Sequence, residues 1–163
     1  MSEVGALCQA CALCCDGTLF ARVSVTETEH ALLERSGLKT ELRAKNKRVL
    51  PQPCGALQGT RCGCYRERPE PCREYVCLLA KALEDGEVSH HGALKVVEEA
   101  RRRSAALGAK LSPGEGPLMR RAREQADTSV EVREALGFLE AHLRRHFLGG
   151  SRAQLFERVR RER

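Results

Sequence analysis

The stretch Cys8-Gln9-Ala10-Cys11-Ala12-Leu13-Cys14-Cys15 places four thiols within eight residues, close to the start of a 163-residue chain. We find no secretory signal, so thiols at this density favour metal binding over disulfides. Each Cys-x-x-Cys step turns the backbone so that two sulfur atoms can converge on one tetrahedral ion. The adjacent pair Cys14-Cys15 differs, because neighbouring side chains usually point in different directions. The stretch therefore predicts half of a larger metal site, holding two ions or a cluster of several metal atoms.

A second group of cysteines follows some forty residues later. Its members are Cys54, Cys62, Cys64, Cys72 and Cys77. Pro69 and Pro71 can stand at the start of a helix, whose first N–H groups have no intrahelical partner. We expect one helix over residues 70–83. It would carry Cys72, with Cys77 five residues later and off the same narrow stripe.

The start of that helix would favour the negative charge of a metal–thiolate group. Three arginines of the same segment could balance this charge further, or could simply be solvated. They are Arg66, Arg68 and Arg73.

The two cysteine groups together resemble the YkgJ-type cysteine-cluster family, which is described as a zinc- or iron-chelating domain. The first matching motif is Cys8-x2-Cys11-x2-Cys14-Cys15-Asp16-Gly17. The second is Cys54 followed by Cys62-x-Cys64-Tyr65-x2-Arg68-Pro69-x2-Cys72-Arg73-x-Tyr75-x-Cys77. The likeness covers about residues 8–77, nearly half of the chain, and both motifs stand in the family's order.

The resemblance implies a metal site with eight thiolate ligands. These are Cys8, Cys11, Cys14, Cys15, Cys54, Cys62, Cys72 and Cys77. Cys64 occupies a place where the family usually has an aliphatic residue before the tyrosine. We therefore leave Cys64 out of the expected ligand set.

Zinc and an iron–sulfur cluster are the two leading candidates for the metal. Eight thiolates could close two tetrahedral zinc sites, which is a structural arrangement. The run from Cys8 to Cys14 also begins like a bacterial ferredoxin motif, but Cys15 follows at once and no cysteine precedes a proline. We place zinc ahead, with iron or an iron–sulfur cluster as the alternative. A thiol redox switch that releases zinc on oxidation stays open as a third hypothesis.

Catalysis is not the favoured interpretation. We find no Ser-His-Asp arrangement, phosphate-binding loop or carboxylate pair, and eight thiolates leave no evident position for a reactive water. His142 and His146 lie four residues apart on an expected helix, but the glutamate of the metalloprotease motif is missing between them. We expect these two histidines to lie on a solvated face. His90-His91 is expected to start a helix and not to bind metal.

Composition and charge narrow the class of partner. Four Phe, two Tyr and no Trp leave a poor aromatic core, so bound metal would add stability that packing lacks. The formal net charge is +6. Eight thiolates with two divalent ions would change it by −4, to +2, and neither half of the chain is distinctly basic. We therefore expect metal ions as partners, no nucleic acid and, with no long apolar run, no membrane, which suggests a cytoplasmic protein.

The remaining sequence predicts mainly helices. We expect a short strand within residues 19–25, then a helix over 27–36 opened by a Thr26/Glu29 capping box, and an irregular connection over 39–48. Amphipathic helices are expected over 89–107, 118–125 and 129–147, with a break at 112–117 and a final basic helix after Ser151.

These patterns predict a mostly α-helical α+β fold. An irregular, metal-bound cysteine domain would span residues 1–83. A helical extension over residues 84–163 would pack on it, and we name no protein partner.

Overall fold

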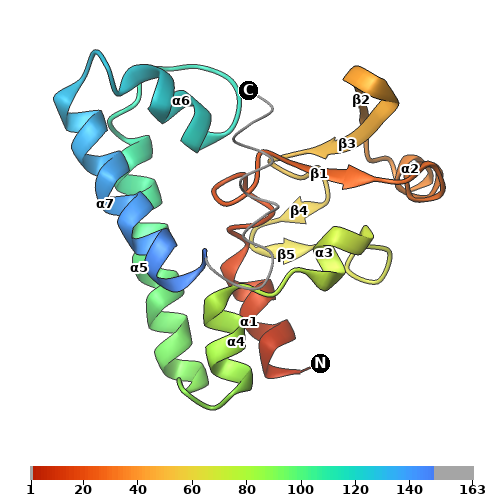
Figure 1. The fold of residues 1–163 in the computed structure, drawn as a ribbon, viewed down its shortest axis with the longest axis horizontal. Helices are drawn as coiled ribbons and strands as arrows, with labels where there is room; N and C mark the ends of the chain where they lie inside the picture. The colour runs from red at the N-terminus through yellow and green to blue at the C-terminus, as the bar shows by residue number, and fades with distance from the viewer. Residues whose placement is uncertain (1, 149–163) are drawn as a thin grey trace.

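A computed structural model describes residues 2–148 of the chain, and it confirms a mostly helical α+β fold (Figure 1). Helices α5, α6 and α7 stand together on one side, and the small strands with α2 and α3 stand on the other. Helices α1 and α4 lie between these two parts. No helix in the described range is long and apolar enough to cross a membrane.

The first cysteines stand on a helix, which the sequence analysis did not foresee. Helix α1 (Glu3–Cys11) begins after Ser2, whose hydroxyl accepts a hydrogen bond from the Gly5 N–H at 3.1 Å. It ends at Ala12, whose φ of 59° is left-handed and breaks the helical path. The sequence analysis gave no secondary structure for this run, although an N-cap residue and helix-favouring Ala and Leu residues precede the cysteine motif.

Two small antiparallel sheets make up the β part. The first has the order β1-β3-β2, and the second is the hairpin β4-β5. The strands are β1 (Arg22–Val25), β2 (Glu41–Arg43), β3 (Lys47–Pro51), β4 (Leu57–Gln58) and β5 (Arg61–Cys62). Pairing of Val23 with Leu50 places both side chains in a small core beneath the first sheet.

The prediction of an irregular connection over residues 39–48 is wrong. This segment contains β2, a short 3-10 turn η1 (Ala44–Asn46) and the start of β3. Lys45 and Asn46 both have positive φ in the tight turn. All three residues of β2 are exposed. An edge strand that is exposed on both faces lacks the apolar alternation by which strands are recognised.

Helix α2 (Glu27–Arg35) confirms the predicted capping box. The Glu29 N–H donates to the Thr26 hydroxyl, and the Thr26 N–H donates to the Glu29 carboxylate. The single helix expected over residues 70–83 is wrong, because the structure divides it into α3 (Glu70–Glu74) and α4 (Leu78–Glu84). Cys77 lies in the break and caps α4, with its sulfur accepting from the Ala80 N–H at 3.3 Å.

Three further helices follow the predicted pattern. They are α5 (His90–Gly108), α6 (Leu118–Gln125) and α7 (Val130–His146). Ser89 and Ser129 cap α5 and α7, and His90 begins α5 as expected. The larger apolar core joins these helices to α1 and α4, while residues after 148, with the helix expected beyond Ser151, lie outside the described residues.

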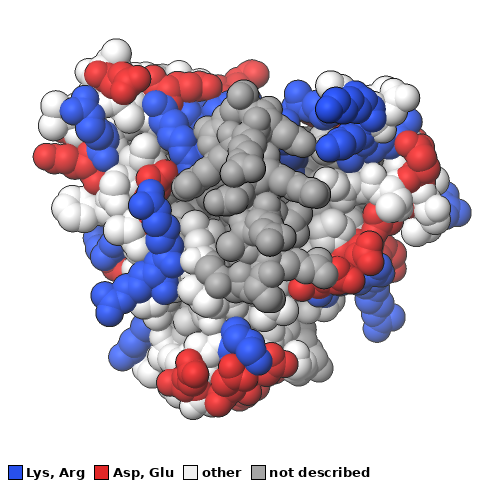
Figure 2. All heavy atoms as spheres, viewed as in Figure 1, with Lys and Arg blue, Asp and Glu red and all other residues white. Residues whose placement is uncertain are grey.

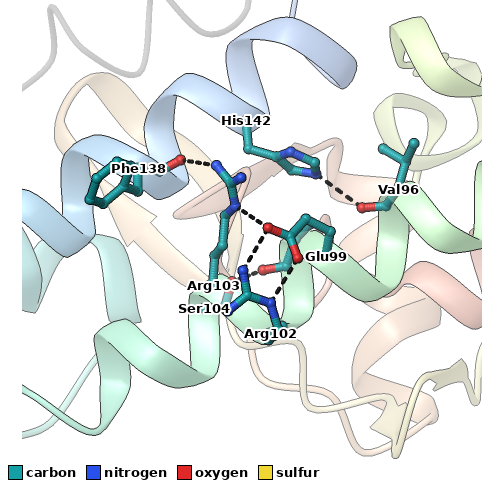
Figure 3. Close-up of polar contacts among 8 residues, drawn as sticks. Val96, Glu99, Arg102, Arg103, Ser104, Phe138 and His142 are labelled. Atoms are coloured by element: carbon teal, nitrogen blue, oxygen red, sulfur yellow. Dashed lines mark hydrogen bonds and ion pairs between the residues drawn. The ribbon is translucent and has the colours of Figure 1, made fainter.

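Helices α5 and α7 are also joined by polar contacts (Figure 3). Glu99 accepts hydrogen bonds from Arg102 and Arg103, and Arg103 donates in addition to the Phe138 carbonyl on α7. His142 is 8% exposed, and its Nε2 lies 3.0 Å from the Val96 carbonyl on α5. The expected solvated face is therefore wrong for His142, because this backbone contact allows the ring to be buried between the two helices.

Charged side chains of both signs are spread over the viewed face of the molecule (Figure 2). On this face no one sign dominates, in agreement with the similar charge balance of the two halves of the sequence.

The contact of α5 with α7 supports a stability prediction. Leu139 is fully buried at 0% exposure, whereas its neighbour Phe138 is 67% exposed. Leu139→Ala should lower the free energy of unfolding by about 2–5 kcal/mol, because it leaves a cavity in the core. Phe138→Ala is the control and should change it by less than about 0.5 kcal/mol. Urea unfolding followed by circular dichroism measures both, and equal losses would contradict this packing.

Candidate metal centre

Helix α1 and the turn after it position the first four cysteines. Cys8 and Cys11 are three residues apart and therefore share one face of α1. The turn is closed by hydrogen bonds from the N–H groups of Cys15 and Asp16 to the Ala12 carbonyl, at 2.8 and 2.9 Å. Cys14 and Cys15 follow one another in this turn and belong to two different clusters of thiols.

The first thiol group consists of Cys8, Cys11, Cys14 and Cys77. Burial, together with Cys77 and Cys8 as negative neighbours, raises the pKa of Cys11 to about 12. Burial also raises the pKa of Cys14, with added effects of Cys11 and Cys77. Three members of this group, Cys11, Cys14 and Cys77, pack against the larger apolar core. Residues near the two ends of the cysteine domain thus come together.

The second thiol group consists of Cys15, Cys54, Cys62 and Cys72, with Cys64 beside them. Burial, together with the nearby Cys62, Cys54 and Cys72, raises the pKa of Cys15 to about 12. The pKa of Cys72 is raised to about 12 by burial and then by Cys54 and Cys62. Cys54, Cys62 and Cys72 pack against the small core beneath the sheet, to which Cys64 itself belongs. Each thiol group is therefore associated with a core of its own.

Two hydrogen bonds hold the amino-terminal run against the second cysteine segment. The Cys54 N–H donates to the Cys15 carbonyl at 2.7 Å. The Cys62 N–H donates to the Gln9 side-chain oxygen at 3.0 Å. Gln9 was not predicted as a functional residue, since one glutamine between two cysteines carries no pattern. It is nevertheless the side chain that ties the helix of the first group to the hairpin of the second.

A cavity of about 620 Å³ connects the two thiol groups, and all nine cysteines line it. No Asp, Glu or His is among the described residues that form its wall. Soft thiolate ligands select zinc, copper(I) and iron–sulfur clusters over magnesium, calcium and manganese. These donors therefore favour a thiophilic metal ion over a hard cation such as magnesium or calcium.

The thiols of each group lie near one another without forming a complete set of metal ligands. Among residues 2–148, no set of three or more Cys, His, Asp or Glu side chains is arranged closely enough to hold an ion. Binding of a shared ion would therefore require the side chains of a group to come closer together.

Arg68 lies near enough to both groups to influence their ionisation. Burial raises the pKa of Cys8 and Cys72, whereas the Arg68 charge lowers both. The guanidinium is held in place above the Tyr65 ring, 3.6 Å from its centroid, and donates to the Tyr65 carbonyl at 2.8 Å. Of the three arginines considered from the sequence, Arg68 is the one with a described effect on the thiols.

Tyr75 closes the site toward the helices. Its hydroxyl donates to the Phe147 carbonyl at 3.2 Å, and its ring meets Phe20 edge-on at 4.8 Å between centroids. Burial raises the Tyr75 pKa well above its ordinary value, and Cys14 and Cys77 raise it further. The phenol therefore stays neutral beside the first group and acts as a hydrogen-bond donor.

Comparison with protein families gives a match, and it covers the cysteine-rich part of the chain. Residues 7–95 match the model of the CxxCxxCC family, described as "Putative zinc- or iron-chelating domain". The matched range contains both thiol groups and more than half of the chain. The chain belongs to the CxxCxxCC family. Comparisons with curated proteins and with solved structures give no match.

The thiol pKa values of this CxxCxxCC protein predict how metal binding depends on pH. Thiols bind as thiolates, but pKa values raised to about 12 keep Cys11, Cys15 and Cys72 protonated near neutral pH. Binding must then displace protons, so affinity rises with pH below about 12 and is lost as the pH falls. With four thiols per ion, about four protons should be released for each ion bound.

Zinc competition with a chromophoric chelator at several pH values, with proton release recorded in weak buffer, measures this dependence. The chelator's own titration serves as the reference. An affinity that does not change with pH would show that metal binding does not displace protons from these thiols.

The position of Arg68 supports a second prediction. Arg68→Met removes the positive charge beside Cys8 and Cys72 and should weaken zinc binding by about tenfold, the scale typical of residues that support metal ligands. Arg66→Met is the matched control, since Arg66 is exposed and should leave zinc affinity unchanged. Equal affinities of the two variants, measured by chelator competition, would rule out an electrostatic role for Arg68.

Proposed function

We propose that this protein binds two zinc ions, each through four thiolates. Cys8, Cys11, Cys14 and Cys77 would hold one ion, and Cys15, Cys54, Cys62 and Cys72 would hold the other. The observation that carries this proposal is the separation of the eight family cysteines into two groups of four, each against its own core. We further propose that residues 1–83 form the metal-binding domain, on which the later helices pack.

Zinc suits this donor set for two reasons. It has no geometric preference from d-electrons, and four cysteines without a water position are typical of its closed structural sites. Burial also supports this choice, because two positive charges offset much of the cost of placing four thiolates among apolar residues. A role in chelation or structural stabilisation follows more readily from this chemistry than catalysis does.

An iron–sulfur protein is the second candidate, and one feature of the chain topology favours it. In two-cluster bacterial ferredoxins, three cysteines of a run bind one cluster and the fourth binds the other. Here Cys14 belongs to the first thiol group, whereas the next cysteine of the run, Cys15, belongs to the second. The first group likewise takes its fourth thiol from elsewhere in the sequence, namely from Cys77. Iron would give the protein an electron-transfer role or a cluster-dependent one.

Metal analysis of the protein purified without oxygen, together with its visible spectrum, tests the proposal. We expect about two zinc ions per chain and no colour. Cys77→Ser should lose one ion by removing a ligand of the first group. The double variant C54S/C72S should lose the other, and each variant serves as the control for the site that it leaves intact.

Three results would argue against two zinc sites. Iron with acid-labile sulfide and a brown colour would establish the second candidate instead. Loss of both ions from Cys77→Ser would show that the two groups form one shared site. Absence of any bound metal after reconstitution with zinc or with iron and sulfide would overturn the metal-binding proposal itself.

A further inference from the structure

Cys64 is the cysteine that the family pattern leaves without a role. It is buried at 7% exposure, whereas the other eight are half-buried or exposed. It belongs to the small core formed with Val23, Leu33 and Leu50, among others. The simplest role for Cys64 is therefore that of a small apolar side chain that fills this core.

The position of the Cys64 sulfur atom indicates a role beyond core packing. The Cys64 and Cys62 sulfur atoms are 3.8 Å apart. Two thiolates bound to one zinc at about 2.3 Å, with tetrahedral angles, are separated by about 3.8 Å. The pair thus already has the spacing of two ligands of a single ion.

The turn after the hairpin brings the two sulfur atoms close together. Cys62 is the last residue of β5, and Gly63 and Cys64 follow in a turn. Between the two cysteines, the Gly63 N–H donates to the Ala56 carbonyl at 2.8 Å. A Cβ at Gly63 would lie only 3.0 Å from that oxygen, so glycine allows this close approach of the two backbone segments.

Cys64 also lies among the other members of the second thiol group. Together with them it lines the cavity described above. Cys54, Cys62 and Cys72 also pack against the small core to which Cys64 belongs. The second thiol group with Cys64 therefore offers five thiols, whereas a tetrahedral ion needs four.

We propose that Cys64 is a fifth metal ligand of the second thiol group and can take the place of Cys62. The inference rests on the proposed function, since it names a further ligand of the same site. The second group would then tolerate the loss of either thiol, whereas the first group, with four thiols for four positions, would tolerate no loss.

A set of cysteine variants of the full chain, loaded with Zn²⁺, tests this proposal. The variants are Cys62→Ala, Cys64→Ala, the double variant C62A/C64A and, for the first group, Cys8→Ala. Zinc per chain is measured after gel filtration with a competing chelator, and circular dichroism reports folding. We expect two ions for each single variant of the second group, and one ion for C62A/C64A and for Cys8→Ala.

The outcomes separate the inference from the function on which it rests. Two zinc ions in the wild type but one in Cys62→Ala would show that Cys64 does not replace Cys62, and would overturn the inference alone. Fewer than two ions in the wild type would overturn the proposed pair of zinc sites, and the inference with it. The Cys62→Ala variant alone tests the inference even if the double variant fails to fold, because it leaves the buried Cys64 in place.

Discussion

The structure depends on one contact between two segments that are distant in the sequence. In this contact, the amino-terminal cysteine run lies against the hairpin region that follows Cys54. The hydrogen bond from the Cys54 N–H to the Cys15 carbonyl, 2.7 Å long, marks this contact. Bringing the segments together costs chain entropy, which grows only slowly with the length of the intervening loop. Sheet pairing, the small core and the Gln9 contact contribute to offsetting this cost.

The thiols stand at the boundary between two apolar cores. Cys11, Cys14 and Cys77 adjoin the larger core of the helices. The second group adjoins the smaller core beneath the sheet. A core with few aromatic residues gains little from packing alone, so a bound ion at each would stabilise a junction that apolar contacts leave weak.

Sequence analysis predicted those parts of the structure whose signals are local. The helices capped by Thr26, Ser89 and Ser129 are confirmed, because cap and apolar period stand next to each other in the chain. The exposed strand β2 and the break between α3 and α4 were missed, since edge exposure and a capping cysteine have no such pattern. The division of Cys14 and Cys15 between two groups could be anticipated from side-chain geometry. Their distant partners could not, because pairing across the fold is a tertiary property.

The adjacency of Cys14 and Cys15 has a consequence for how the two groups act together. One peptide bond joins a member of the first group to a member of the second, and the pKa of Cys14 is raised by burial and then by neighbours of both groups, Cys11 and Cys15. If two ions bind as proposed, an ion that fixed the turn after Ala12 for one group would fix it for the other. The entropy of fixing this turn would be lost only once, so occupation of either site would favour occupation of its neighbour. Because linkage is reciprocal, the effect would be the same whichever site filled first.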